Sequence, residues 1–116
     1  MAAAWESLHR AALEIASADS VKQRVTNAFS KHLDELDVGS LPGELRPRYL
    51  DLVARLTRVP PLRGETAVAA TVRKMSNEEA AECAQQIVEL LAEAATARAP
   101  ITVRSRPLLS VYSADG

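Results

Sequence analysis

The residue types that most often carry out chemistry are scarce in this sequence. It holds one cysteine, Cys83, and two histidines, His9 and His32. A cysteine nucleophile needs a histidine beside it as a base, and these three residues fall on separate predicted helices. No Cys or His pair has zinc-ligand spacing, no HExxH motif occurs, and the acidic residues do not form a calcium loop. We therefore expect no metal, no cofactor and no enzymatic activity.

The four glycines do not form a phosphate-binding loop. Gly39 follows a predicted helix, Gly43 and Gly64 lie close to prolines, and Gly116 is the last residue of the sequence. A P-loop or a dinucleotide fingerprint needs closely spaced glycines directly after a strand. These glycines are therefore interpreted as turn residues and not as part of a nucleotide site.

Charge is segregated along the chain, although the net charge is only −1. Residues 42–74 carry seven basic and three acidic side chains, whereas residues 75–97 carry five glutamates and no base. Charge blocks of opposite sign are typical of surfaces that meet each other or a partner. The candidate interaction residues come from these two blocks and are Arg55, Arg58, Arg63, Arg73, Lys74, Glu82, Glu89 and Glu93.

The acidic block places like charges on one helix face. Glu78 and Glu82, and likewise Glu89 and Glu93, stand four residues apart, and each such pair costs about 0.2–0.5 kcal/mol. A helix with this repulsion is expected to lie beside the basic segment, either of its own chain or of a second copy. As an alternative, the basic segment 46–74 could bind nucleic acid, because arginine recognises phosphate well. The sequence pI of about 6.1 is low for a dedicated nucleic-acid-binding protein.

Composition predicts the elements that position these side chains. The 116 residues include 21 alanines and 14 leucines, which favour helices, and only 3% aromatic residues. We predict an all-α fold, a compact bundle of four to five short helices with an extended C-terminal tail. The bundle domain is expected to span residues 1–99 and the non-helical tail residues 100–116, because Pro100 ends the last helix.

Hydrophobic periodicity and capping signals place the individual helices. We expect helices over residues 3–16, 20–38, 47–58, 65–74 and 76–98, with capping boxes at Ser20 and Ser76. Prolines 60 and 61 keep residues 59–62 extended. The first helix is expected to bury Trp5, Leu8, Ala12 and Ile15, and the last helix Ala80, Ala84, Ile87, Val88, Leu91, Ala94 and Ala95. Cys83 lies one position from that stripe and is expected to be half-buried.

Aromatic residues and alanines are unevenly distributed over the predicted helices. Trp5, Phe29 and Tyr49 fall one on each of the first three main helices and are expected to anchor the core, with Tyr112 in the tail. Eleven of the alanines lie between residues 67 and 99. The last helix is therefore a slim, acidic element, and a partner is expected to bind there.

These features predict a small, non-enzymatic, cytoplasmic interaction or adaptor protein that self-associates as a homodimer or binds another protein. The alternative is a small nucleic-acid-associated regulator that uses the basic segment 46–74. A membrane protein is not expected, because the longest uncharged run, residues 107–114, is far shorter than a membrane span. A lone cysteine and the lack of a signal-peptide pattern in residues 1–6 favour the reducing cytoplasm.

Overall fold

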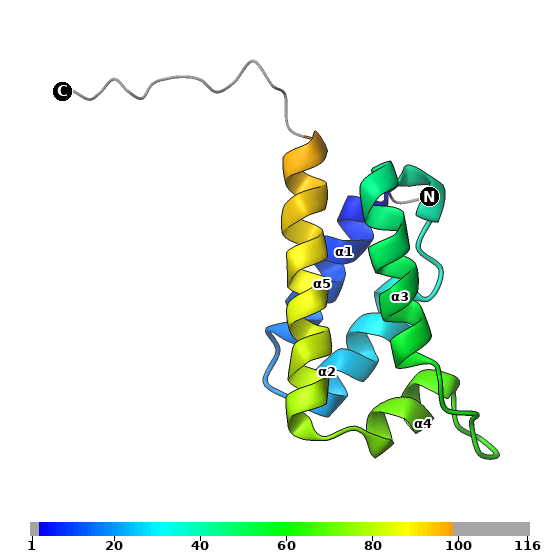
Figure 1. Cartoon of the computed structure of the whole chain (residues 1–116). Coiled ribbons are helices and arrows are strands. Elements are labelled where there is room, and N and C mark those ends of the chain that lie inside the picture. The colour runs from blue at the N-terminus through cyan, green and yellow to red at the C-terminus, as the bar shows by residue number, and fades with distance from the viewer. Residues whose placement is uncertain (1–2, 99–116) are drawn as a thin grey trace.

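Five α-helices make up most of residues 3–98, the part of the chain that the computed structural model describes (Figure 1). They are α1 (Ala4–Ile15), α2 (Val21–Ala28), α3 (Arg46–Leu56), α4 (Ala67–Lys74) and α5 (Asn77–Arg98). The described residues contain no strand, so the predicted all-α bundle is confirmed. The predicted tail, residues 100–116, lies outside the described residues.

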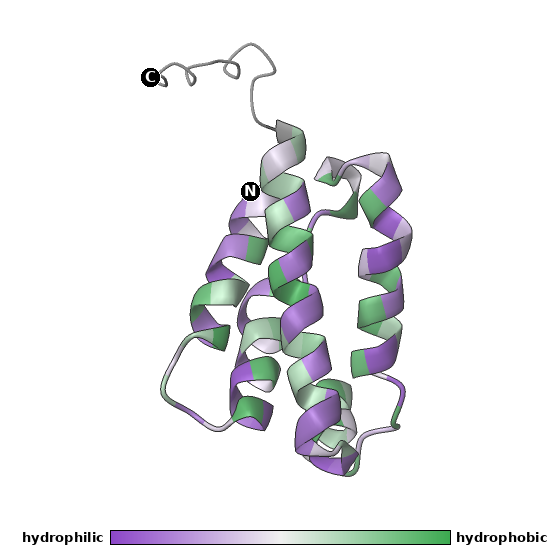
Figure 2. Cartoon of the chain, turned by 60° about the vertical axis from the view of Figure 1, so that its left-hand side comes forward, coloured by the Kyte–Doolittle hydropathy of each residue, from purple (hydrophilic) through white to green (hydrophobic). Residues whose placement is uncertain are grey.

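The longest helix, α5, runs the length of the bundle, and α1, α2 and α3 all contact it. Figure 2 shows hydrophobic and hydrophilic residues alternating along the helices, as amphipathic packing requires. The largest fully buried side chains include aliphatic residues from both the N-terminal and the C-terminal helices: Leu8, Leu33, Leu45, Leu52, Leu56, Ile87 and Leu90. Burial of these side chains provides the main driving force for folding.

Local hydrogen bonds set the starts of α5 and α2. The Ser76 hydroxyl accepts from the Glu79 N–H at 3.0 Å, and Glu79 Oε1 accepts from the Ser76 N–H at 2.8 Å. This is the capping box predicted from the sequence, and it holds the pKa of Glu79 below its ordinary value. Ser20 caps α2 through the Gln23 N–H, but the Gln23 side chain bonds Asn27 and does not return to Ser20. Of the capping box predicted at Ser20, only the bond to the serine hydroxyl is therefore formed.

The second predicted helix ends earlier than the sequence indicates. α2 passes at Ala28 into a π-helical turn, Phe29–Leu33, and a separate 3-10 turn follows at Val38–Ser40. The expected end near residue 38 was wrong, because three acidic side chains over residues 34–37 are unfavourable at the negative C-terminal end of a helix. The buried Tyr49 hydroxyl donates to the Leu33 carbonyl at 2.6 Å and satisfies that helix end.

The buried faces of two helices differ from the predicted stripes. On α5, Cys83 and Leu90 are buried, whereas Val88 is 45% exposed and Ala95 is exposed. Cys83 is thus fully buried and not half-buried, because neighbours pack on more than one side of α5 and shift its buried sector toward α3. On α1 the buried residues are Ala4, Leu8 and Ala11; Trp5, Ala12 and Ile15 are only partly buried.

Two of the predicted aromatic anchors lie in the core. Phe29 and Tyr49 are buried, whereas Trp5 is half-buried at the edge of the hydrophobic cluster. Tyr112 lies outside the described residues. The aromatic anchoring of the first helix is therefore weaker than expected, and aliphatic side chains fill most of the interior.

Candidate interaction surfaces

Arginines of α3 pair with glutamates of α5. Arg55 Nη2 lies 2.7 Å from Glu82 Oε1, and Arg48 Nη1 lies 2.6 Å from Glu93 Oε1. The hydrogen bond that Arg55 donates to Glu82 raises the pKa of Arg55, and the bond that Arg48 donates to Glu93 does the same for Arg48. These two pairs lie on the surface and attach the basic helix of the chain to its own acidic helix.

Sequence reasoning did not place Arg48 among the candidate interaction residues. The spacing in the sequence could have indicated it, because Arg48 and Arg55 are seven residues apart and so lie on one face of α3. Arg48 pairs with Glu93 and Arg55 with Glu82, the reversed order that two antiparallel helices produce.

Arg73 finds its partner within the basic block and not on α5. Its Nε lies 2.8 Å from Glu65 Oε2, and its Nη2 lies 3.1 Å from Glu65 Oε1. This two-bond contact lowers the pKa of the Glu65 carboxyl. The helix predicted to begin at Glu65 begins at Ala67, with the Thr66 hydroxyl as its cap, and Glu65 belongs to the preceding loop.

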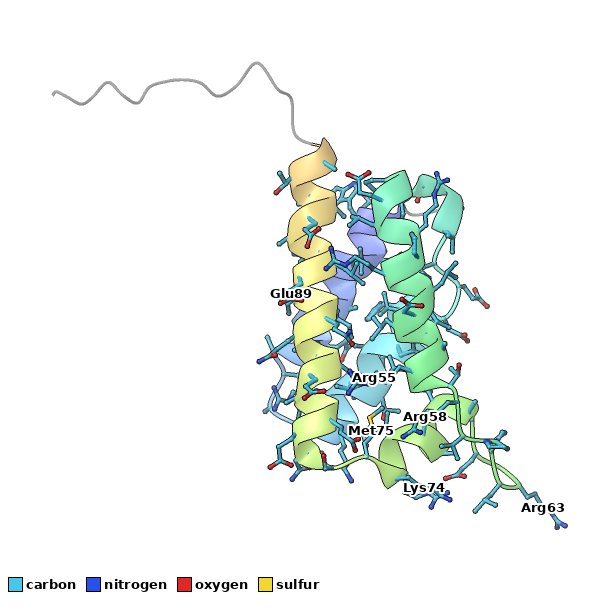
Figure 3. All side chains as sticks on the ribbon, viewed as in Figure 1. Arg55, Arg58, Arg63, Lys74, Met75 and Glu89 are labelled. Atoms are coloured by element: carbon cyan, nitrogen blue, oxygen red, sulfur yellow. The ribbon has the colours of Figure 1, made fainter. Side chains whose placement is uncertain are left out.

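Three of the predicted cations remain outside any ion pair or hydrogen bond among residues 3–98. They are Arg58, Arg63 and Lys74, all exposed, at the end of the bundle formed by α4 and the 57–66 loop (Figure 3). Glu89 is also exposed and projects from α5 away from α3. Of the eight predicted interaction residues, the structure therefore pairs four with each other or with neighbours and leaves four at the surface.

Two residues hold the 57–66 loop in place, Thr71 of α4 and Glu65 within the loop itself. The Thr71 hydroxyl accepts from the Val59 N–H at 3.0 Å and donates to the Ala67 carbonyl at 2.8 Å. Glu65 Oε1 accepts from the Leu62 N–H at 3.1 Å. Thr71 is the one polar residue among residues 3–98 that is fully buried, which only the packed structure reveals.

The flank of α5 on the α1 side is apolar, in contrast to its acidic flank. A hollow of about 270 Å³ lies there, lined by Ile15, Ala84, Gln85, Val88 and Glu89. Val88 is 45% exposed, and no other described side chain covers it fully. The two sides of α5 therefore differ: Glu82 and Glu93 pair with α3, whereas Ala84 and Val88 contribute the apolar part of the hollow.

The residues considered for catalysis do not come together. His32 Nε2 lies 3.2 Å from Glu14 Oε2, and His9 is exposed on α1. Cys83 lies on the buried face of α5. Burial raises the pKa of the Cys83 thiol, which disfavours the reactive thiolate. Within residues 3–98, no three His, Cys, Asp or Glu side chains gather closely enough to hold a metal ion.

No helix among the described residues has the length and apolar character needed to cross a membrane. The chain matches no family model, no curated protein and no solved structure.

Proposed function

We propose that this protein is a non-enzymatic interaction module that self-associates through the apolar flank of α5. The observation that supports this proposal is the division of α5 into two flanks. Two of its five glutamates, Glu82 and Glu93, pair with arginines of its own α3, so that flank of the helix is already engaged within the chain. The opposite flank leaves Val88 45% exposed beside an apolar hollow.

The spacing on this flank suits a second copy of the same helix. Val88 lies at the middle of α5, and Ala81, Ala92 and Ala95 lie on the same flank at helical spacing. In an antiparallel pair about a two-fold axis, Val88 would meet Val88 of the second copy, and Ala81 would meet Ala95 of the second copy. Small side chains allow two helices to approach closely, which increases the contact area.

Sedimentation equilibrium over a concentration series tests the proposal. We expect the wild-type chain to form a dimer at micromolar concentrations, and Val88→Glu to weaken it by about tenfold or more. The matched control is Leu50→Glu, because Leu50 is also an exposed large aliphatic residue, 52% exposed, but lies on α3. A wild-type monomer at high micromolar concentration, or equal loss of the dimer in both variants, contradicts the proposal.

A second candidate function is nucleic-acid binding at the end of the bundle formed by α4 and the 57–66 loop. Arg58, Arg63 and Lys74 gather near the 57–66 loop and are not paired with other described residues (Figure 3). Such contacts to phosphate weaken steeply with salt. Titration with double- and single-stranded oligonucleotides at about 50 mM salt tests this candidate, and binding that Arg63→Glu does not weaken would count against it.

We further propose that the protein works in a reducing compartment such as the cytoplasm. Its one cysteine, Cys83, is buried as a free thiol. A buried thiol acts as a small hydrophobic group and needs no disulfide partner. Detection of the native chain by antibody in cytosolic against membrane and exported fractions tests the location.

A further inference from the structure

The 59–63 segment is the most exposed apolar part of the described chain. Leu62 is 65% exposed, more than any other large hydrophobic residue among residues 3–98, and Pro60, Pro61 and Arg63 are exposed as well. Figure 3 shows Arg63 at the tip of the loop, where the loop extends away from the helices. A single exposed leucine is ordinary on a protein surface, but here it lies next to two exposed prolines at the tip of a projecting loop, so the apolar residues are contiguous.

Hydrogen bonds fix the shape of this segment at both ends. The Val59 N–H donates to the buried Thr71 hydroxyl at 3.0 Å, and the Leu62 N–H donates to Glu65 Oε1 at 3.1 Å. The Glu65 N–H returns a bond to the Leu62 carbonyl at 3.0 Å, and Gly64 makes the turn with a φ of 81°. A preorganised loop loses less conformational entropy on binding than a mobile one.

Prolines determine the conformation between these ends. Each proline fixes its own φ near about −65° and pushes the residue before it into the extended or polyproline region. These two rules favour the extended or polyproline region for Val59 and Pro60 and fix the φ of Pro61, and Leu62 follows. Arg58 and Arg63 flank the stretch, both exposed.

We propose that the 58–63 segment is a docking site for a partner protein whose groove is lined by aromatic side chains and edged by acidic ones. Aromatic grooves bind polyproline-like segments because the proline rings and one aliphatic side chain fill the spaces between the aromatic rings. The flanking arginines then set the direction of binding through acidic residues at the edge of the groove. This surface lies apart from the α5 flank, so the proposal does not depend on self-association.

A protein partner fits this segment better than nucleic acid. Phosphate contacts would use Arg58, Arg63 and Lys74 but would leave the prolines and Leu62 without a role. A groove of aromatic side chains uses all of these features at once. The two partners therefore differ in their dependence on Pro61, which a binding experiment can measure.

The test measures binding of the full chain to a panel of purified SH3, WW and EVH1 domains, which carry such grooves. We expect at least one domain to bind with a micromolar Kd, and Pro61→Ala and Arg63→Glu each to weaken that binding by about tenfold. The matched controls, Leu50→Ala and Arg10→Glu, change an exposed aliphatic and an exposed basic residue elsewhere. Both controls are expected to bind as the wild type does, and circular dichroism confirms that each variant is folded.

Three results overturn the proposal. One is the absence of binding by every domain up to about 0.5 mM. Another is loss of binding in Arg63→Glu with no change in Pro61→Ala, which is the behaviour of a partner that recognises charge alone. The third is an equal loss of binding in the control variants, which would place the contact elsewhere on the surface.

Discussion

The guanidinium of Arg55 lies 2.7 Å from the carboxylate of Glu82 and joins α3 to α5. Glu82 stands four residues after Glu78, a spacing that is unfavourable on an isolated helix. Arg55 also donates to Gln86 Oε1 at 3.4 Å, so a single side chain contacts two residues on that side of α5. The repulsion within the acidic block is thereby offset by the basic block of the same chain.

The Arg55–Glu82 pair is predicted to contribute little to stability. Its side chains are 31% and 61% exposed, so water and salt screen it, and we expect a coupling free energy of at most about 0.5 kcal/mol. A double-mutant cycle with Arg55→Ala and Glu82→Ala in urea unfolding measures it. We expect the coupling to shrink as salt rises to about 1 M. A coupling that grows with salt would contradict a surface ion pair.

Tyr49→Phe is predicted to destabilise the fold at neutral pH. The Tyr49 hydroxyl donates to the Leu33 carbonyl at 2.6 Å in the core, and its removal leaves that carbonyl with only the bond from the Leu36 N–H at 3.1 Å. Loss of one such hydrogen bond costs about 0.5–1.5 kcal/mol of unfolding free energy. Urea unfolding of both chains gives this difference; equal stability would mean that the Tyr49 hydroxyl adds nothing to the bond from Leu36.

Alkaline pH is predicted to destabilise the wild type through the same residue. Burial raises the pKa of Tyr49 to about 12, above the usual value near 10. Below pH ~10 the phenol is protonated in both states, and between about pH 10 and 12 only the unfolded state ionises, so stability falls as pH rises. The slope approaches about 1.4 kcal/mol per pH unit, and Tyr49→Phe, measured in parallel, lacks this component.

Features encoded by neighbouring residues could be predicted from the sequence. The capping box of Ser76 and Glu79 is one, and the helical break at prolines 60 and 61 is another. Both depend on backbone chemistry within a few residues, so periodicity and residue type suffice. The attraction between the basic and acidic blocks could also be predicted, because segments of opposite charge in one chain favour pairing.

Features set by packing could not be predicted in the same way. Val88 and Leu90 are two residues apart on α5, and the sequence alone does not show how far the buried sector extends toward α3. The structure buries Leu90 and exposes Val88, which moves Val88 from the predicted core to the proposed interface. The role of Thr71 depends on a contact with Val59, twelve residues earlier, which no local pattern encodes.

Cys83 is predicted to be chemically inert while the protein is folded. The thiol is fully buried, and burial raises its pKa. Ellman's reagent is expected to label it only at the rate at which the chain unfolds, with complete reaction in denaturant. Rapid labelling of the native chain would contradict the buried position.

The loss of unfolding free energy on substituting Cys83 is predicted to depend more on the polarity of the new side chain than on its size. Cys83→Ser places a hydroxyl in an apolar site and is expected to cost about 1–3 kcal/mol of unfolding free energy. Cys83→Ala removes one atom without adding a polar group and is expected to cost about 1 kcal/mol. Thermal and urea unfolding rank the variants, and a serine variant as stable as the alanine variant would indicate a hydrogen-bond partner for residue 83.

Thr71→Val is predicted to loosen the 57–66 loop while it preserves the shape of the core. Valine occupies nearly the same volume as threonine, but it removes the oxygen that accepts the Val59 N–H at 3.0 Å. The partly buried amide of Val59 then lacks an acceptor, and we expect a loss of about 1–2 kcal/mol and faster hydrogen exchange at Val59. Thr71→Ser keeps the oxygen and is expected to retain the protection of Val59. If the Val59 amide exchanges equally slowly in both variants, the hydroxyl does not hold the loop. If it exchanges faster only in Thr71→Val, Thr71 preorganises the segment proposed for docking.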